Sequence, residues 1–179
     1  MTTWLLLPLL IVLLGVWLLR QGRRAYQATG LPAGEIVYSD TGMWQKVEKS
    51  LINRQHGLIG KPDYVVQTEE KGRTITIPVE VKSAKRPPSP HAGHLLQLGA
   101  YCLLVEEVYQ RTPPYGLLHY ADATLRIPFT EELRHLVLST ADAIRRTQDA
   151  NQVHRSHHEP HRCRVCGYQH RCGKQQLTQ

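Results

Sequence analysis

Two acidic residues and a lysine have the types and the spacing of a site that cleaves phosphodiesters. Asp63 follows a turn-like Gly-Lys-Pro at residues 60–62, and Glu80-Val81-Lys82 comes after 16 intervening residues. Side chains alternate along a strand, so Glu80 and Lys82 project from one face and can meet the Asp63 carboxylate. Two carboxylates and the backbone carbonyl of Val81 would form an oxygen-rich site for Mg²⁺ or Mn²⁺. The lysine would help to activate water and stabilise charge on a phosphate.

A second polar pair favours such a site over a simpler interpretation. Glu-x-Lys is a common pattern, and Glu80 and Lys82 could instead form an exposed salt bridge on a solvated strand face. Gln97 and Tyr101, however, lie four residues apart and share a helix face. There they could contact a nucleic-acid backbone or hold the lysine in place. The alternative for this pair is a partly buried helix with a hydrogen-bonded tyrosine.

Three cysteines near the C-terminus form a second candidate site. Cys163-x2-Cys166-x5-Cys172 places three thiols within ten residues among Arg and His. This spacing is typical of a metal site, and basic surroundings favour thiolates. Zinc would take a fourth ligand from a nearby histidine, whereas an iron–sulfur cluster would prefer a fourth thiolate. The candidate histidines are His157, His158, His161 and His170.

Strands and helices are predicted around these residues. Alternating apolar and polar side chains over 74–83 predict a half-buried strand, in which Pro78 suggests an edge position or a bulge. Helical spacing predicts a helix over 94–109. Further strands are predicted over 35–39, 64–66, 115–120 and 125–129, and a second helix over 130–148 with Thr130 as its N-cap.

The N-terminus is apolar and predicts a membrane anchor. Residues 4–19 are uninterruptedly apolar, which is close to the roughly 20 residues of a transmembrane helix. Basic residues follow this run at 20–24, so the positive-inside tendency predicts a single-pass anchor over 1–20 with the domain in the cytoplasm. The competing interpretation is a cleaved secretory signal, but no basic residue precedes the run. We expect a linker over 21–33, a core over 34–150 and a basic tail over 151–179.

Length and charge limit the classes of protein. The 179 residues allow one compact domain and an appendage, which excludes multi-domain motors and large synthases. From residue 145 to the end, seven Lys and Arg stand against two acidic residues, so five of the seven formal positive charges lie there. This segment suits binding to DNA phosphates, or is simply a solvated surface.

Taken together, the Gly-x-Pro-Asp, Glu-x-Lys and Gln-x-x-x-Tyr motifs resemble the PD-(D/E)XK nuclease superfamily. The resemblance is closest to its RecB-like branch and to CRISPR-associated exonucleases of the Cas-four type. It implies a mixed α/β, restriction-endonuclease-like fold, a sheet flanked by helices. It also implies that Asp63 and Glu80 hold a metal, that Lys82 assists catalysis, and that Gln97 and Tyr101 are the RecB-type additional motif. The implied activity is metal-dependent DNA cleavage from an end, with CRISPR adaptation or DNA-repair proteins as partners.

The same resemblance implies a [4Fe–4S] cluster on Cys163, Cys166 and Cys172. The family places a fourth cysteine ahead of its nuclease motifs, whereas no cysteine here precedes Cys102. Cys102 could be recruited or could be a small buried side chain, and a histidine, zinc or loss of the metal are the other options. RecB-like enzymes often add a histidine upstream of the first aspartate, but His56 lies too close to Asp63 for that role to be transferred.

Two other functions compete with the nuclease. One is a non-catalytic, membrane-tethered DNA-binding or scaffold protein that keeps the nuclease fold. The other is a zinc-ribbon-like membrane adaptor that binds protein.

Overall fold

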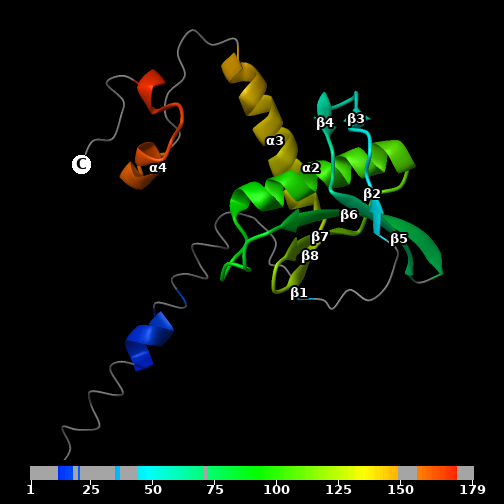
Figure 1. Cartoon of the computed structure of the whole chain (residues 1–179), viewed down its shortest axis with the longest axis horizontal. Helices are drawn as coiled ribbons and strands as arrows, with labels where there is room; N and C mark the ends of the chain where they lie inside the picture. Colours follow the sequence, from blue (N-terminus) through cyan, green and yellow to red (C-terminus); the bar gives the residue numbers. More distant parts are fainter. Residues whose placement is uncertain are drawn as a thin grey trace, which may run out of the picture. The chain divides into compact units, whose positions relative to one another are not determined.

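The computed structural model describes residues 12–17, 20, 35–36, 44–70, 72–148 and 157–172. Contacts divide the chain into two units, Met1–Leu138 and Ser139–Gln179, and each is treated by itself. All of the acidic, lysine, glutamine and tyrosine candidates belong to the first unit (Figure 1).

A six-stranded mixed sheet forms the framework of the first unit. Its strand order is β1-β8-β7-β6-β5-β2. Only the β6–β7 pair is parallel among these described strands, and the other neighbours are antiparallel. The strands are β1 (Glu35–Ile36), β2 (Trp44–Lys46), β5 (Tyr64–Glu70), β6 (Arg73–Lys82), β7 (Tyr115–Tyr120) and β8 (Thr124–Pro128).

The strand β6 confirms the strand predicted over 74–83, but it is neither half-buried nor at an edge. Residues 76–80 are all buried, because β6 lies between β5 and β7 and both of its faces are covered. The suggestion of an edge from Pro78 is therefore wrong. Pro78 has no backbone N–H to donate. This loss costs little stability, because the hydrogen-bonded ladder with β7 begins one residue later, at the pair Val79 and Leu117.

Helix α2 (Ala92–Tyr109) confirms the helix predicted over 94–109 and connects the parallel strands β6 and β7. It packs on one face of the sheet, and a separate hairpin, β3 (Leu51–Asn53) and β4 (Leu58–Gly60), packs on it in turn (Figure 1). The Asn53 side-chain amide anchors this hairpin by donating to the carbonyl of Leu103 over 3.2 Å. Packing on two sides explains why two apolar stripes of α2 are buried.

Helix α3 (Glu131–Gln148) confirms the second predicted helix, and the Thr130 hydroxyl accepts a hydrogen bond from the backbone N–H of Leu133 at 3.3 Å. The first half of α3 joins α2, β7 and β8 in the main apolar core through Leu133 and Val137. A smaller apolar cluster, which includes Ile77 and Val79 of β6, covers the other face of the sheet. The predicted mixed sheet flanked by helices is thus correct for this unit.

The transmembrane helix predicted over residues 1–20 is wrong. Among the described residues, no helix combines the length and the apolar character needed to cross a membrane. The membrane-anchored, single-pass localisation depended on that helix and is corrected with it. The rest of the apolar run and the predicted linker at 21–33 lie outside the described residues.

In the second unit, the described residues form the second half of α3, a short helix α4 (Pro160–Arg164) and a 3-10 turn η1 (Gln169–Arg171). The sequence patterns did not predict α4 or η1, which are too short for a periodic signal.

Candidate active site

The two predicted acidic residues come together where β5 begins and β6 ends. Asp63 directly precedes β5, whose first residue pairs with Val79 of β6. One carboxylate oxygen of Asp63 accepts a hydrogen bond of 2.8 Å from the backbone N–H of Val81. The antiparallel register therefore brings Asp63 beside Glu80, although 16 residues separate them in the sequence.

Glu80 lies in an environment that disfavours its charge. Its side chain is only 8% exposed. Burial raises the pKa of Glu80, the nearby Asp63 carboxylate adds to the rise, and a hydrogen bond from Lys82 opposes it. The alternative of an exposed salt bridge is wrong, because Glu80 faces α2 rather than solvent.

A chain of hydrogen bonds links the acidic pair to helix α2. The Lys82 ammonium donates to a carboxylate oxygen of Glu80 at 2.7 Å and to the side-chain oxygen of Gln97 at 3.0 Å. The Gln97 amide in turn donates to the Tyr101 hydroxyl oxygen at 2.9 Å. Burial raises the pKa of Tyr101 above its ordinary value of 10.0, so this phenol stays protonated well above neutral pH. The structure thus joins the predicted strand and helix motifs into one connected group.

Gly60 lets Tyr101 pack closely against the end of β4, three residues before Asp63. A Cβ atom at this position would lie 3.0 Å from a Tyr101 ring carbon and 2.9 Å from a Leu104 methyl carbon, closer than ordinary contacts. The glycine of the Gly-Lys-Pro-Asp segment therefore has a packing function. It brings β4 against α2 and so fixes the start of the Asp63 segment.

Two side chains beside the lysine were missed by the sequence analysis. The Nδ1 atom of His94 lies 3.0 Å from the hydroxyl of Tyr120, which is the register partner of Lys82. Burial lowers the pKa of His94, and the charges of Lys82 and His91 lower it further. His94 precedes Gln97 by three residues, so helical spacing alone would have placed both on one face.

The acidic pair fits a hard divalent cation. Two carboxylates converge, and the proximity of Asp63 raises the pKa of Glu80, which is the repulsion that a cation relieves. The N–H and C=O of a strand residue share an edge, so the Val81 carbonyl is on the Asp63 side. No group of three or more His, Cys, Asp or Glu that could hold a metal occurs among the described residues. Ligation would therefore combine two carboxylates, one backbone oxygen and water, which suits Mg²⁺ or Mn²⁺.

The three C-terminal cysteines do not form a metal-holding group with other described residues. All three are described, and they differ in environment: Cys163 is buried, Cys166 is exposed and Cys172 is intermediate. They fall outside any metal-holding group of the described residues, so their side chains as placed do not fit the predicted iron–sulfur cluster or zinc.

The fourth cysteine lies in the first unit. Cys102 is buried on α2, and this burial raises the pKa of its thiol. The interpretation of a small buried side chain agrees with this position. A role as the fourth cluster ligand stays a prediction that the burial does not favour.

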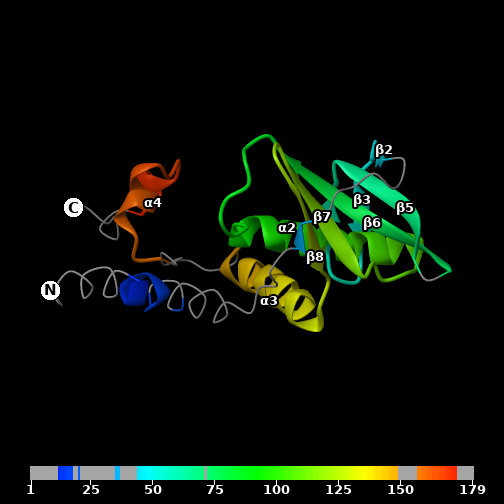
Figure 2. The same cartoon turned by 90° about the horizontal axis from the view of Figure 1, so that it is seen from below.

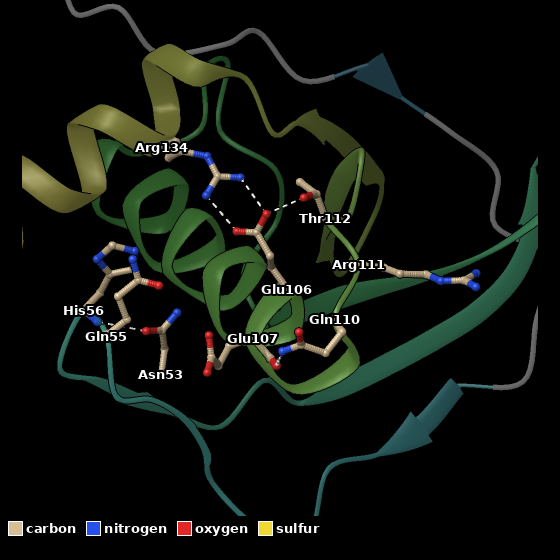
Figure 3. A pocket seen from close by; sticks show the side chains of 9 residues that line it. All are labelled: Asn53, Gln55, His56, Glu106, Glu107, Gln110, Arg111, Thr112 and Arg134. Atoms are coloured by element: carbon tan, nitrogen blue, oxygen red, sulfur yellow. Dashed lines mark hydrogen bonds and ion pairs between the residues drawn. The ribbon is translucent and has the colours of Figure 1, made fainter.

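A polar cavity of about 400 Å³ lies elsewhere in the first unit (Figure 3). His56, Glu106, Arg134 and other polar side chains line it, but none of the predicted catalytic residues does. In Figure 3, Arg134 forms a two-pronged ion pair with Glu106, at 2.7 and 3.0 Å. His56 thus lines this cavity, which agrees with leaving it out of the predicted catalytic set.

Known proteins are similar to this chain in sequence. A profile of the PD-(D/E)XK nuclease superfamily matches residues 14–173. The CRISPR-associated exonuclease Cas4 of Francisella tularensis subsp. novicida (strain U112) is 29% identical over 124 residues, which cover 69% of this chain and 60% of that protein. The chain therefore matches only about three fifths of this relative's length.

A solved structure is also similar. The crystal structure of SSO0001 is matched at a TM-score of 0.46 and 19% identity, over 78% of this chain and 62% of that one. A similarity of this size adds no weight to the assignment. The superfamily profile, in contrast, spans most of the sequence and confirms the predicted family. The chain belongs to the PD-(D/E)XK nuclease superfamily.

Proposed function

We propose that this nuclease is a Mg²⁺- or Mn²⁺-dependent deoxyribonuclease that degrades linear DNA from its ends. The observation that carries the proposal is the connected group in which Asp63 lies beside Glu80, and Lys82 bridges Glu80 to Gln97. Nucleases of this superfamily generally use these two ions. The exonuclease activity is extended to this chain from the Francisella relative.

Asp63, Glu80 and the Val81 carbonyl would hold the cation, which when bound supplies Lewis-acid stabilisation of charge on the phosphate. Lys82 has three N–H donors, and two of them go to Glu80 and Gln97. The third is left for an attacking water or a phosphate oxygen. The hydrogen bonds to Glu80 and Gln97 fix the direction of this third N–H. Lys82 therefore needs little reorganisation to stabilise developing charge.

Gln97 and Tyr101 position the lysine. The Gln97 side chain is fixed at both ends, since its oxygen accepts from Lys82 and its amide donates to Tyr101. The Tyr101 hydroxyl keeps its own proton to donate. In this proposal, the two residues act through Lys82.

The cellular setting that we propose is DNA processing in CRISPR adaptation or DNA repair. The support is the relative's name, a CRISPR-associated exonuclease, and it extends to this chain only as a proposal. Proteins of either process are the proposed partners, and DNA is the proposed substrate.

The test uses the full chain with end-labelled linear DNA and with circular single-stranded DNA, in Mg²⁺, Mn²⁺ or EDTA. We expect degradation of linear DNA only, and only with the metal. Glu80→Gln should abolish it at unchanged melting temperature. Glu69→Gln is the matched control, because it makes the same change at an exposed position near the other end of β5. Equal activity in the wild type and Glu80→Gln would contradict the proposal. Salt-sensitive DNA binding without cleavage in any divalent ion would favour the non-catalytic alternative.

A further inference from the structure

The segment that joins β6 to α2 is an exposed loop beside the candidate active site. It covers residues 83–91 and follows Lys82 directly. Figure 2 shows it as the green loop that leaves the end of β6 and returns to the start of α2. It is called the connector loop below.

Hydrogen bonds hold the connector loop against the turn between β7 and β8. The backbone N–H of Ala121 donates to the carbonyl of Ala84 at 3.1 Å. The backbone N–H of Arg86 donates to a carboxylate oxygen of Asp122 at 2.7 Å. Prolines at 87, 88 and 90 restrict the backbone of the rest of the loop. The loop is therefore fixed at its start by contacts and stiffened further along by its composition.

The connector loop presents two basic side chains that have no acidic partner in the described part of the chain. Lys85 and Arg86 are both exposed, and neither forms an ion pair with any described residue. Asp122, whose carboxylate contacts the loop, accepts from the Arg86 backbone rather than from a basic side chain. The loop's other side chains are Pro, Ser, Ala and His, so it offers charge without a large apolar surface.

The position of these charges relates them to the catalytic group. Lys85 comes three positions after Lys82, which is at most about 11 Å of extended backbone. Nucleotides in a duplex strand rise about 3.4 Å each. The two cations therefore lie within a few nucleotide steps of any phosphate held at Lys82.

We infer that the connector loop binds the phosphate backbone of the DNA strand presented for cleavage, with Lys85 and Arg86 as the contacts and Asp122 as a positioning residue. The inference rests on the proposed nuclease function, since it assigns part of the same substrate. Contacts of this kind are independent of base sequence and fix the register of the strand. A cation on a rigid loop loses less backbone entropy on binding than one on a free loop.

The first experiment measures binding of the full chain to a fluorescent single-stranded oligonucleotide in EDTA, from low to high salt. Arg86→Ala and Lys85→Ala should each weaken binding about three- to tenfold and reduce the slope of log K against log salt by about 0.7, the value for one phosphate on a single strand. Arg73→Ala is the matched control. It removes an exposed charge at the opposite end of β6, about 30 Å from Lys82, and should leave the slope unchanged.

The second experiment isolates the Asp122 hydrogen bond. Asp122→Asn keeps an acceptor for the Arg86 backbone but removes the charge, whereas Asp122→Ala removes both. We expect Asp122→Asn to cleave linear DNA about as fast as the wild type, and Asp122→Ala to cleave it severalfold more slowly at the same melting temperature. Equal rates for the two variants would overturn the positioning role.

The outcomes separate the inference from the proposed function. If the wild type cleaves DNA but Arg86→Ala and Lys85→Ala keep the wild-type slope, the connector loop does not bind phosphates and the inference is overturned. If the wild type fails to cleave, yet both variants lose slope and Arg73→Ala does not, the nuclease proposal fails while phosphate binding by the loop is supported.

Discussion

The candidate catalytic residues are distant in the sequence but close in space, whereas the C-terminal cysteines are close in the sequence but do not form one site among the described residues. The catalytic candidates come from a loop, a strand and a helix, yet hydrogen bonds of 2.7 to 3.0 Å connect them. The cysteines lie within ten residues of one another, yet they occupy buried, exposed and intermediate positions and form no metal-holding group. The side chains of the first region are positioned by strand register and by packing on helix α2, whereas Cys163 lies on the short helix α4 and Cys172 directly follows the turn η1.

The largest effect is expected from breaking the connected group at its centre. Lys82→Ala removes the donor that joins Glu80 to Gln97 and should lower the cleavage rate at least about a hundredfold. Lys49→Ala, at an exposed position outside the group, is the matched control. Single-turnover cleavage of linear DNA measures both. A loss below tenfold for Lys82→Ala would mean that the hydrogen-bonded arrangement is not the catalytic one.

A smaller effect on stability is expected from disturbing the packing that supports the group. Gly60→Ala forces a methyl group against Tyr101 and Leu104 and should cost about 1–3 kcal/mol of unfolding free energy. It should also slow cleavage, because Tyr101 supports Gln97. Gly93→Ala is the control, since nothing lies within 4 Å of its new methyl group. Urea denaturation measures both variants. If Gly60→Ala were as stable as the wild type, Tyr101 would move aside at little cost.

The ion pair between α2 and α3 gives a pH-dependent contribution to stability. Hydrogen bonds from Arg134 are the main cause that lowers the pKa of Glu106 below its ordinary value of 4.5. The folded state therefore binds fewer protons at this site than the unfolded state. The stabilisation is complete above the ordinary pKa and is lost as the pH falls through the lowered folded-state pKa.

Glu106→Gln should remove this pH dependence of stability. Because the Glu106 side chain is partly exposed, the substitution should lower the free energy of unfolding at pH 7 by only about 1 kcal/mol. Thermal melting between pH 3 and pH 7 measures it, with Glu48→Gln at an exposed position as the control. A melting curve for Glu106→Gln that falls with acid as steeply as the wild type's would assign the pH dependence to other groups.

The smallest effect is expected in the cysteine segment. Every hydrogen bond described within the group of candidate catalytic residues is made inside the first unit, and Cys166 is an exposed residue of the second. Cys166→Ser should therefore change the cleavage rate by less than about twofold. Anaerobic purification with iron and zinc analysis accompanies the assay. Bound iron or zinc in the wild type, lost together with activity in Cys166→Ser, would break the comparison by showing that the thiols assemble and matter.

The sequence was most informative where periodic patterns are long. The strand of Glu80 and Lys82 and the helix of Gln97 and Tyr101 were predicted because ten or more residues repeat a single period. The three-residue strands β2, β3 and β4 carry no such signal, and β6 was misjudged at Pro78 because the position of a strand within a sheet depends on its neighbours.

The structure brings together the residues that the sequence singled out, but their contacts could not be predicted. Strand alternation put Glu80 and Lys82 on one face, which the structure confirms. The contact between His94 and Tyr120 depends on the parallel register of β6 and β7, which no local pattern encodes. The spacing of the cysteines predicted a metal, but spacing alone does not fix how a chain of short turns directs its thiols.

The hydrogen bond from the Val81 N–H to Asp63 gives this carboxylate a structural role, because it ends the hydrogen-bonded ladder between β5 and β6. Its oxygen occupies the place that a backbone carbonyl would take if β5 continued, so the Val81 amide is capped without another strand residue. An alanine at position 63 would leave that amide open and would fray the strand end along with the chemistry. Asparagine keeps an acceptor, so Asp63→Asn is the substitution that separates loss of charge from loss of the strand's end.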